Sequence, residues 1–256
     1  MTLREHLLEF RRRLVISAAS VMLLAVLGFV NYQRIFDVLS APFTAYKRAN
    51  PHSLISLNFG NATAAFSNQV NVAVFVGIVA SSPVWLYQLW AFIVPGLTRK
   101  EKRISLAFVA AIVPLFGVGC WFGYWILPRS LRILYGFTPQ GASNIQQTTD
   151  YFTFVTRFIL VFGLTFLFPV FLIGLNLMHV LPSHVMIKSW RPAVVFIFVF
   201  AAIATPTPDP YTMFLLATPL VLLYFGAYGV AWFFDRRRAR SRPEWIEVPD
   251  DQASPL

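Results

Sequence analysis

Long apolar stretches alternate with short polar segments along this chain. Six apolar segments are recognisable, and five of them are near or above the ~20 residues that a helix needs to cross a bilayer. They cover residues 14–31, 70–95, 104–127, 152–178, 192–204 and 211–234. The fifth has only 13 residues, so it must thin the bilayer, recruit its flanks or fail to span. The pattern predicts an all-α membrane protein with six transmembrane helices, the fifth of them short.

The residues before the first apolar segment have an amphipathic pattern. Leu3, Leu7 and Phe10 recur at helical intervals and make one apolar face, while Glu5 and Glu9 share a polar one. We therefore expect residues 1–13 to form a short helix that lies on the membrane surface.

Several prolines and two loops shape the expected architecture. The loop 31–69 carries many apolar residues and is expected to fold as a cap or to dip into the interface. The turn 204–210 is rich in proline and has Asp209 near its tip, whereas residues 235–256 are expected to form a disordered tail, basic and then acidic. Proline inside a helix bends it, and several bent helices favour a curved wall over a tight bundle. The prolines inside the apolar segments are Pro83, Pro114, Pro169 and Pro219.

Composition and charge agree with the membrane assignment. The chain is 57% hydrophobic and only 12% charged, about half the charge of a soluble domain. With both termini inside and six spans, fifteen Lys and Arg residues fall on the cytoplasmic side and five outside. This asymmetry is the positive-inside pattern, so the net charge of +10 indicates membrane orientation and not nucleic-acid binding.

The membrane segments contain little reactive chemistry. None of the six holds an Asp or Glu, and the ionisable groups near the hydrocarbon are Arg157 and His179, both expected to reach toward an interface. Cys120 is the only cysteine, the histidines lack metal-ligand spacing, and no cofactor is expected. A small-solute secondary transporter or channel would need intramembrane polar ligands, and a membrane enzyme would need paired catalytic groups. The transporter or channel stays the main alternative function.

Two carboxylates on the expected cytoplasmic side remain, Glu9 and Glu101. Glu101 lies in a polar turn that holds four cations and follows the aromatic stretch 85–92. Both carboxylates can be exposed groups paired with neighbouring cations, which contribute little. They can also receive a partner's guanidinium groups, with the aromatic residues as an apolar wall. The second interpretation predicts a basic, partly apolar peptide as the partner.

These same segments resemble the TatC family, the twin-arginine translocase subunit. The similarity covers about residues 3–235, with the family's motifs in order and at the expected spacing. The opening HLLEFRRRL is similar to the family's HLxELRxRL. The other matching motifs are Ser40–Pro42, Pro83–Leu97 with Lys100–Arg103, Phe162–Val170, Arg191–Pro192 and Thr205–Pro210.

The resemblance implies both a shape and a function. It implies a curved, glove-like arrangement of six spans, N-in and C-in in the bacterial cytoplasmic membrane, with short last two helices. It implies a receptor for the twin-arginine signal peptides of folded cargo, and no enzyme. This receptor would form homo-oligomers among membrane lipids. It would work with the single-span subunits TatA and TatB and use the proton-motive force. The residues implied to bind the signal are Glu9, Arg11, Phe92, Lys100, Glu101 and Arg103. Those implied in structure or assembly are Pro42, Pro83, Leu167, Asp209 and Met213.

Two positions depart from the family pattern. Many members have a glutamate where this chain has Leu167, and a glutamine where it has Met213. We expect both positions to face the concave side or a partner helix. The replacements make that face more apolar and shift more of the recognition onto the turn around Glu101.

Overall fold

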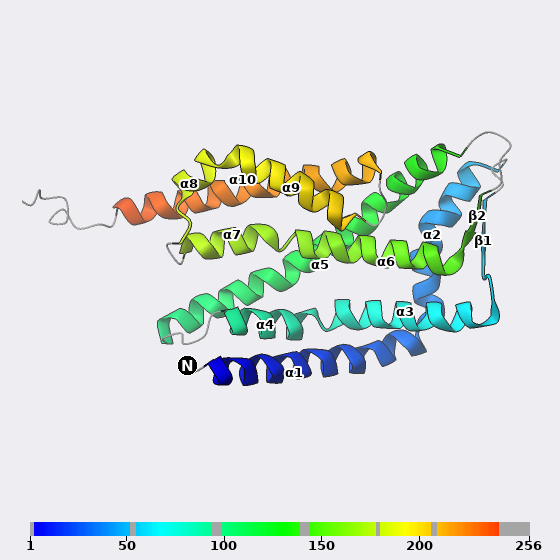
Figure 1. The fold of residues 1–256 in the computed structure, drawn as a ribbon, viewed down its shortest axis with the longest axis horizontal. Helices are drawn as coiled ribbons and strands as arrows, with labels where there is room; N and C mark the ends of the chain where they lie inside the picture. Colours follow the sequence, from blue (N-terminus) through cyan, green and yellow to red (C-terminus); the bar gives the residue numbers. More distant parts are fainter. Residues whose placement is uncertain are drawn as a thin grey trace, which may run out of the picture.

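A computed structural model describes residues 3–51, 55–93, 99–138, 144–177, 180–205 and 209–240, without the side chains of residues 3, 93, 99–109, 144, 239 and 240. In this part of the chain the structure is helical apart from one two-stranded sheet. Most of the helices run side by side along the long axis of the molecule, whereas α2 stands across this axis at one end (Figure 1). The predicted class, an all-α membrane protein, is confirmed.

Helix α1 spans Leu3–Val30 without interruption. The separate surface helix predicted for residues 1–13 is therefore wrong. No glycine or proline lies in residues 3–27, so the i−4 hydrogen bonds continue from the first turns into the apolar segment. At about 1.5 Å per residue, its 28 residues extend about 42 Å, which is longer than a bilayer core of about 30 Å.

The second apolar segment forms two helices, α3 (Ala62–Ala80) and α4 (Ser82–Ile93). The break falls at Ser81, and Pro83 is the second residue of α4. A proline has no N–H to donate and disfavours helix in the residue before it, so one helix ends and another begins. Helix α3 begins earlier than the predicted segment because the Asn61 side chain accepts from the Ala64 N–H at 2.7 Å and caps it.

Helix α5 spans Arg99–Gly136 and is the longest element, with 38 residues. The predicted polar turn at residues 98–103 is wrong, because Arg99–Arg103 already belong to this helix; residues 94–98 lie outside the described part. Its length of about 57 Å far exceeds a bilayer core. Figure 1 shows it crossing the other helices diagonally.

The fourth apolar segment is also broken. Helix α6 (Thr148–Thr165) and α7 (Phe168–Leu177) are separated at Phe166 and Leu167. Pro169 is the second residue of α7, so the same rule applies as at Pro83. The helix is thus interrupted next to this proline, while the bend predicted there stays a prediction.

The last part contains α8 (Ser183–Lys188), α9 (Trp190–Ala204) and α10 (Pro210–Arg240). Helix α9 has 15 residues and is short, as predicted. Helix α10 has 31, so the expectation of two short final helices is wrong. The tail was predicted to be disordered from residue 235, but 235–240 continue α10, since nothing there interrupts the helical hydrogen bonds. Residues 241–256 lie outside the described part.

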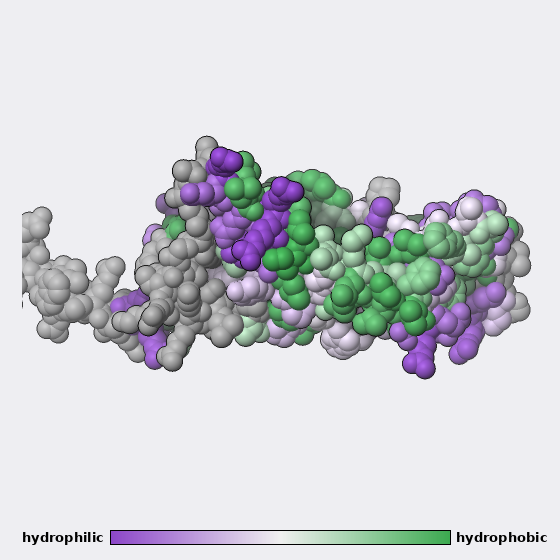
Figure 2. All heavy atoms as spheres, turned by 90° about the horizontal axis from the view of Figure 1, so that it is seen from below, coloured by the Kyte–Doolittle hydropathy of each residue, from purple (hydrophilic) through white to green (hydrophobic). Residues whose placement is uncertain are grey.

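Five helical stretches in the described part are long and apolar enough to cross a membrane, and α9 is shorter. The count of six spans therefore remains a prediction. Figure 2 shows hydrophilic residues gathered toward the two ends of the molecule, with mostly hydrophobic residues between them. A membrane protein needs this distribution, because its middle contacts lipid and its ends contact water.

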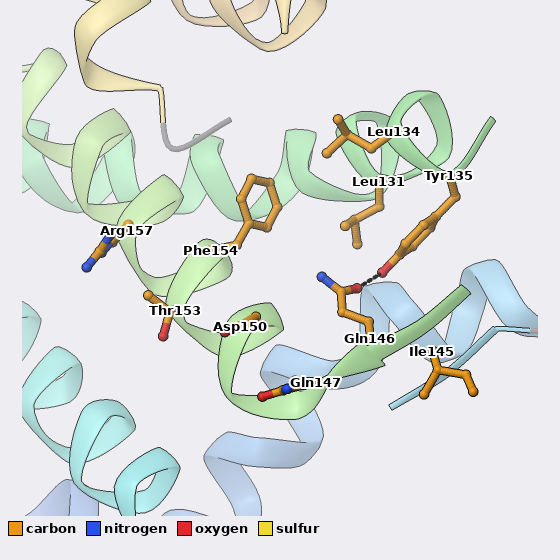
Figure 3. A pocket seen from close by; sticks show the side chains of 10 residues that line it. All are labelled: Leu131, Leu134, Tyr135, Ile145, Gln146, Gln147, Asp150, Thr153, Phe154 and Arg157. Atoms are coloured by element: carbon orange, nitrogen blue, oxygen red, sulfur yellow. Dashed lines mark hydrogen bonds between the residues drawn. The ribbon is translucent and has the colours of Figure 1, made fainter. Parts of the chain in front are cut away.

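A small cap closes the end opposite the N-terminus (Figure 1). It consists of α2 (Tyr32–Ala49) and the parallel strands β1 (Ile55–Asn58) and β2 (Asn144–Gln147), whose register pairs Ile55 with Asn144. The loop 31–69 is thus folded. The sequence did not indicate the sheet. Tyr135 of α5 donates to the Gln146 side chain of β2, at the edge of a hollow shown in Figure 3.

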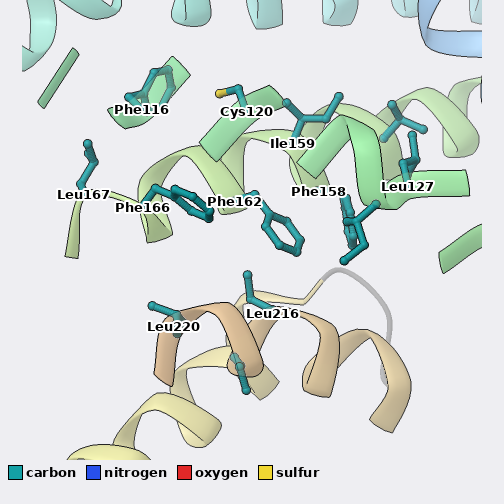
Figure 4. Packing of buried hydrophobic residues seen from close by; sticks show 14 of the residues in the cluster. Phe116, Cys120, Leu127, Phe158, Ile159, Phe162, Phe166, Leu167, Leu216 and Leu220 are labelled. Carbon is teal, nitrogen blue, oxygen red and sulfur yellow. The ribbon is translucent and has the colours of Figure 1, made fainter. Parts of the chain in front are cut away.

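The core lies where α5, α6 and α10 meet, as Figure 4 shows. Phe162 is fully buried and packs beside Phe158, with ring centroids 4.8 Å apart. Glycines allow α5 and α6 to approach closely. A Cβ added at Gly119 would lie 2.7 Å from the Phe162 carbonyl oxygen. Gly119 of α5 thus leaves room for the backbone of α6 at Phe162, and this close contact fixes the position of α6.

Candidate functional site

The start of α1 and the end of α4 lie together at one end of the molecule (Figure 1). His6, Glu9, Phe10 and Arg13 recur at helical intervals of three and four, so they share the face of α1 that meets α4. Pro83 makes α4 a separate helix, whose end carries Gln88.

An aromatic cluster forms one part of this face. The half-buried Phe92 of α4 stacks on His6, with ring centroids 4.5 Å apart and an interplanar angle of 20°. Phe10 lies against the same ring at 5.2 Å. Such aromatic contacts contribute about 0.5–1.5 kcal/mol each beyond burial. They dock the first turns of α1 onto α4.

A charged cluster lies beside the rings. Both Nε and Nη2 of Arg13 donate to Oε1 of Glu9, at 3.0 Å and 2.6 Å, and Nη1 donates to Gln88 Oε1 at 3.2 Å. The Arg13 and Glu9 side chains are 23% and 26% exposed. Within the described part of the chain, nothing donates to the second oxygen of Glu9. The carboxylate is therefore held in place, holds one guanidinium and remains open to another donor.

The remaining residues predicted to bind the signal are placed less completely. Lys100, Glu101 and Arg103 lie in the first turns of α5, which begins at the same end of the molecule as α1 and near the end of α4 (Figure 1). Their side chains lie outside the described part. Arg11 is exposed, two residues after Glu9 and so on the other side of α1. The structure thus brings Glu9 and Phe92 together, but it does not bring Arg11 to them.

The residues predicted for structure or assembly lie elsewhere. Pro42 is buried inside α2 in the cap, and Pro83 starts α4 with an exposed ring. Asp209 precedes α10, where its carboxylate accepts from the Thr212 N–H at 2.7 Å and from the Thr212 hydroxyl. It therefore caps the helix.

The two positions that depart from the family pattern are not on an open face. Leu167 is 3% exposed and packs in the core, and Met213 is half-buried against it. The expectation that both face a concave surface or a partner is wrong for Leu167. A leucine at the break between α6 and α7 can be buried at no electrostatic cost, whereas a carboxylate there would need a partner or a proton.

A further polar cluster at the same end as α1 was missed. Asp235 of α10 accepts from Asn176 Nδ2 at 3.1 Å and from the Ser183 N–H at 2.8 Å. Arg238 lies 3.5 Å from Asp235 and donates to the carbonyl oxygens of Asn176 and Leu177. The cluster ties α10 to the end of α7. The sequence pattern that could have revealed this cluster is one acid directly after an apolar segment and before a run of arginines. These residues were predicted only as part of a disordered tail.

The fold defines a multi-pass helical membrane protein, and the two clusters on α1 and α4 lie at one end of its helices. The family model for "Sec-independent protein translocase protein (TatC)" matches residues 5–219. The chain belongs to the TatC family, which is a family of protein translocase components.

Individual relatives agree with this family. The Sec-independent protein translocase protein TatC of Xylanimonas cellulosilytica is 42% identical over 94% of this chain and 87% of its own length. The protein of the same name from Frankia casuarinae is 40% identical over 100% of this chain and 73% of its own. A crystal structure described as the twin-arginine translocase receptor TatC is 30% identical, covers 89% of this chain and 98% of that chain, and has a TM-score of 0.75. A second, in DDM, has the same TM-score and 29% identity.

Proposed function

We propose that this TatC chain is the receptor for twin-arginine signal peptides in a Sec-independent translocase that exports folded proteins. One observation carries the proposal, namely that Glu9 already holds the guanidinium of Arg13 beside the stacked ring of Phe92. A carboxylate that is positioned for an arginine of its own chain is positioned for an arginine of a partner. A solved relative that is described as a receptor supports the same function.

The proposed surface has two acidic positions. Glu9 would take one signal arginine on α1, and Glu101, in the first turn of α5, would take the other. Lys100 and Arg103 flank Glu101 in the sequence and belong to the same proposed site. Phe92 and its neighbours would contact the apolar residues of the signal. Arg11 stays in the proposal as an exposed cation on the other side of α1 that a longer partner segment reaches.

The proposed setting is the bacterial cytoplasmic membrane, with both termini cytoplasmic. The excess of Lys and Arg in the segments at the α1 end supports this orientation. The partners would be the single-span subunits TatA and TatB and further copies of this chain, and the driving force would be the proton-motive force. These assignments rest on the family.

Site-specific photo-crosslinking in native membranes tests the proposal. A photoreactive residue at Lys102, next to Glu101 in the sequence, and another at Gln88, near Glu9, should capture a twin-arginine signal. A lysine-pair signal should be captured much more weakly, because lysine lacks the planar guanidinium fork.

A control position distinguishes this surface from general contact with the membrane end. Val180 is 65% exposed and lies between α7 and α8, at the same end of the molecule but away from α1 and α4. Capture at Val180 should be low for both signals. Equal capture of both signals at Lys102 and Gln88, or no capture at either, would contradict the proposal.

A further inference from the structure

A hollow of about 640 Å³ lies at the cap end, between the last turns of α5, strand β2 and the first turns of α6 (Figure 3). In the figure Arg157 lies at one end and the Tyr135–Gln146 pair at the other. None of the residues discussed for the signal peptide lines it. The residues that do are Leu131, Leu134, Tyr135, Ile145, Gln146, Gln147, Asp150, Thr153, Phe154 and Arg157.

Arg157 carries an unneutralised charge within the fourth apolar segment. Its side chain is exposed, and among the described residues it pairs with no carboxylate. A cation within an apolar segment is costly unless it reaches the interface, where a lipid headgroup can supply an anion. Phosphate suits a guanidinium because its oxygens accept two parallel hydrogen bonds.

Asp150 lies seven residues earlier, which is two helical turns and about 10 Å along the same face of α6. It too is exposed and lines the hollow. Thr153 lies between the two charges, and its hydroxyl is oriented by accepting from Asn71 Nδ2 at 3.0 Å. The hollow therefore presents an acid and a base in a fixed order, the acid nearer the cap.

The same face becomes apolar a further seven residues along. Leu164 is 50% exposed and, with Phe171, lines a second hollow of about 300 Å³ between α6, α7, α9 and α10. The other linings of that hollow are apolar except for Thr165. Acid, base and apolar hollow thus follow one another at intervals of seven residues.

This order matches the structure of one lipid class. A phospholipid with a primary ammonium headgroup has its ammonium outermost, then its phosphate, then its acyl chains. We propose that this face of α6 binds such a lipid from the leaflet at the cap end. Its phosphate lies on Arg157, its ammonium at Asp150 and one acyl chain against Leu164 and Phe171. A choline headgroup has no N–H to donate to Asp150, and a glycerol headgroup has no cation for it.

Native mass spectrometry of the purified full chain tests this, with equimolar phosphatidylethanolamine, phosphatidylcholine and phosphatidylglycerol added. The ethanolamine lipid should be the main adduct. Arg157→Gln should lower its occupancy about tenfold, because a charge-assisted hydrogen bond is lost. Asp150→Asn should abolish the preference for ethanolamine over choline while lipid still binds.

Matched controls are Arg132→Gln and Asp37→Asn, exposed residues of the same types that do not line the hollow. They should leave the adducts unchanged. The proposal is wrong if the unmodified chain shows no headgroup preference or prefers phosphatidylglycerol, or if Arg157→Gln behaves like Arg132→Gln. The proposal is also wrong if the adduct that depends on Arg157 is inorganic phosphate alone, or if a peptide adduct appears in place of the lipid adduct.

A second measurement avoids dependence on the folding of the variants. A photoactivatable phosphatidylethanolamine, with its reactive group in the acyl chain, is crosslinked to the unmodified chain in membranes. Peptide mapping should place the adduct mainly on residues 160–171 or on α9. Adducts spread evenly over all lipid-facing helices would contradict a defined site.

Discussion

At the scale of single residues, Arg13 and Glu9 set the chemistry of the proposed recognition surface. Their contact joins two groups that are each about one-quarter exposed, so it is partly screened by water. An incoming guanidinium has to share or replace the internal one. The Arg13 guanidinium thus competes with the ligand for Glu9, and it also holds the Glu9 carboxylate in position.

Opposite effects are expected from replacing the two partners. Glu9→Gln should lower the affinity for a twin-arginine signal peptide about tenfold, because a charge-assisted contact is lost. Arg13→Gln should raise it a few-fold, since the carboxylate is then unoccupied. Fluorescence anisotropy with a labelled signal peptide in detergent measures both. A loss of affinity in Arg13→Gln similar to that in Glu9→Gln would show that Arg13 only supports the fold.

Asp235 illustrates a residue whose importance lies in stability. Asp235→Ala removes the acceptor for Asn176 and for the Ser183 N–H, and Asn176 is 1% exposed. Asn176 Nδ2 keeps its bond to the Leu181 carbonyl oxygen, but the buried Ser183 N–H loses its acceptor, which costs about 1–3 kcal/mol. We expect a thermal midpoint in detergent several degrees lower, while Asp37→Ala on the exposed face of α2 should shift it little. Equal midpoints for the two variants would contradict the tie between α7 and α10.

Helix breaks decide how the elements are arranged. The sequence predicted bends at four prolines, and at two of them, Pro83 and Pro169, the structure begins a new helix. The other two, Pro114 and Pro219, lie inside α5 and α10, so a proline alone did not reveal where helices end. The continuity of α1 was not predictable from its amphipathic first turns, since the local pattern of a surface helix and of a projecting span is the same. The parallel β1–β2 pair was missed because it joins loops far apart in sequence.

The contact between α5 and α6 gives a matched test at this scale. Gly119 and Gly117 both lie in α5, but an added Cβ would meet α6 only at Gly119, whereas at Gly117 nothing lies within 4 Å. Gly119→Ala should destabilise the chain, because the Phe162 backbone cannot move aside easily. Gly117→Ala should be neutral or stabilise it by up to about 1 kcal/mol through helix propensity. Thermal midpoints of unfolding in detergent measure both effects. An unchanged midpoint for Gly119→Ala would contradict the close packing of α5 against α6.

Sequence and structure differ in what they determine about the whole molecule. Hydrophobic pattern and motif order sufficed for the fold class and family, because both depend on features spread over the whole chain. The proposed recognition surface was half predictable. Glu9 and Phe92 came from motifs, but the Arg13–Gln88 and His6–Phe92 contacts depend on how α1 packs against α4. Burial of Leu167 could not be foreseen, since it depends on the break between α6 and α7.

Orientation is a whole-molecule prediction. Cys120 is the only cysteine and is buried, so a Cys120→Ala background allows single cysteines to be labelled with a membrane-impermeant maleimide. Lys47→Cys in the cap should react in intact cells, whereas Leu7→Cys at the start of α1 should react only after lysis. The reverse pattern would place the recognition surface outside the cell and contradict the proposed function.

The central claim is that Glu9 and Glu101 receive the two arginines of a signal peptide, and a double-mutant cycle tests it most directly. Affinity is measured for the unmodified chain and for Glu9→Gln and Glu101→Gln, each against an arginine-pair and a lysine-pair signal. Because each carboxylate is proposed to act through the guanidinium, each variant should weaken arginine-pair binding about tenfold and change lysine-pair binding little. Equal losses for both signals would mean that the acids do not contact the arginine pair.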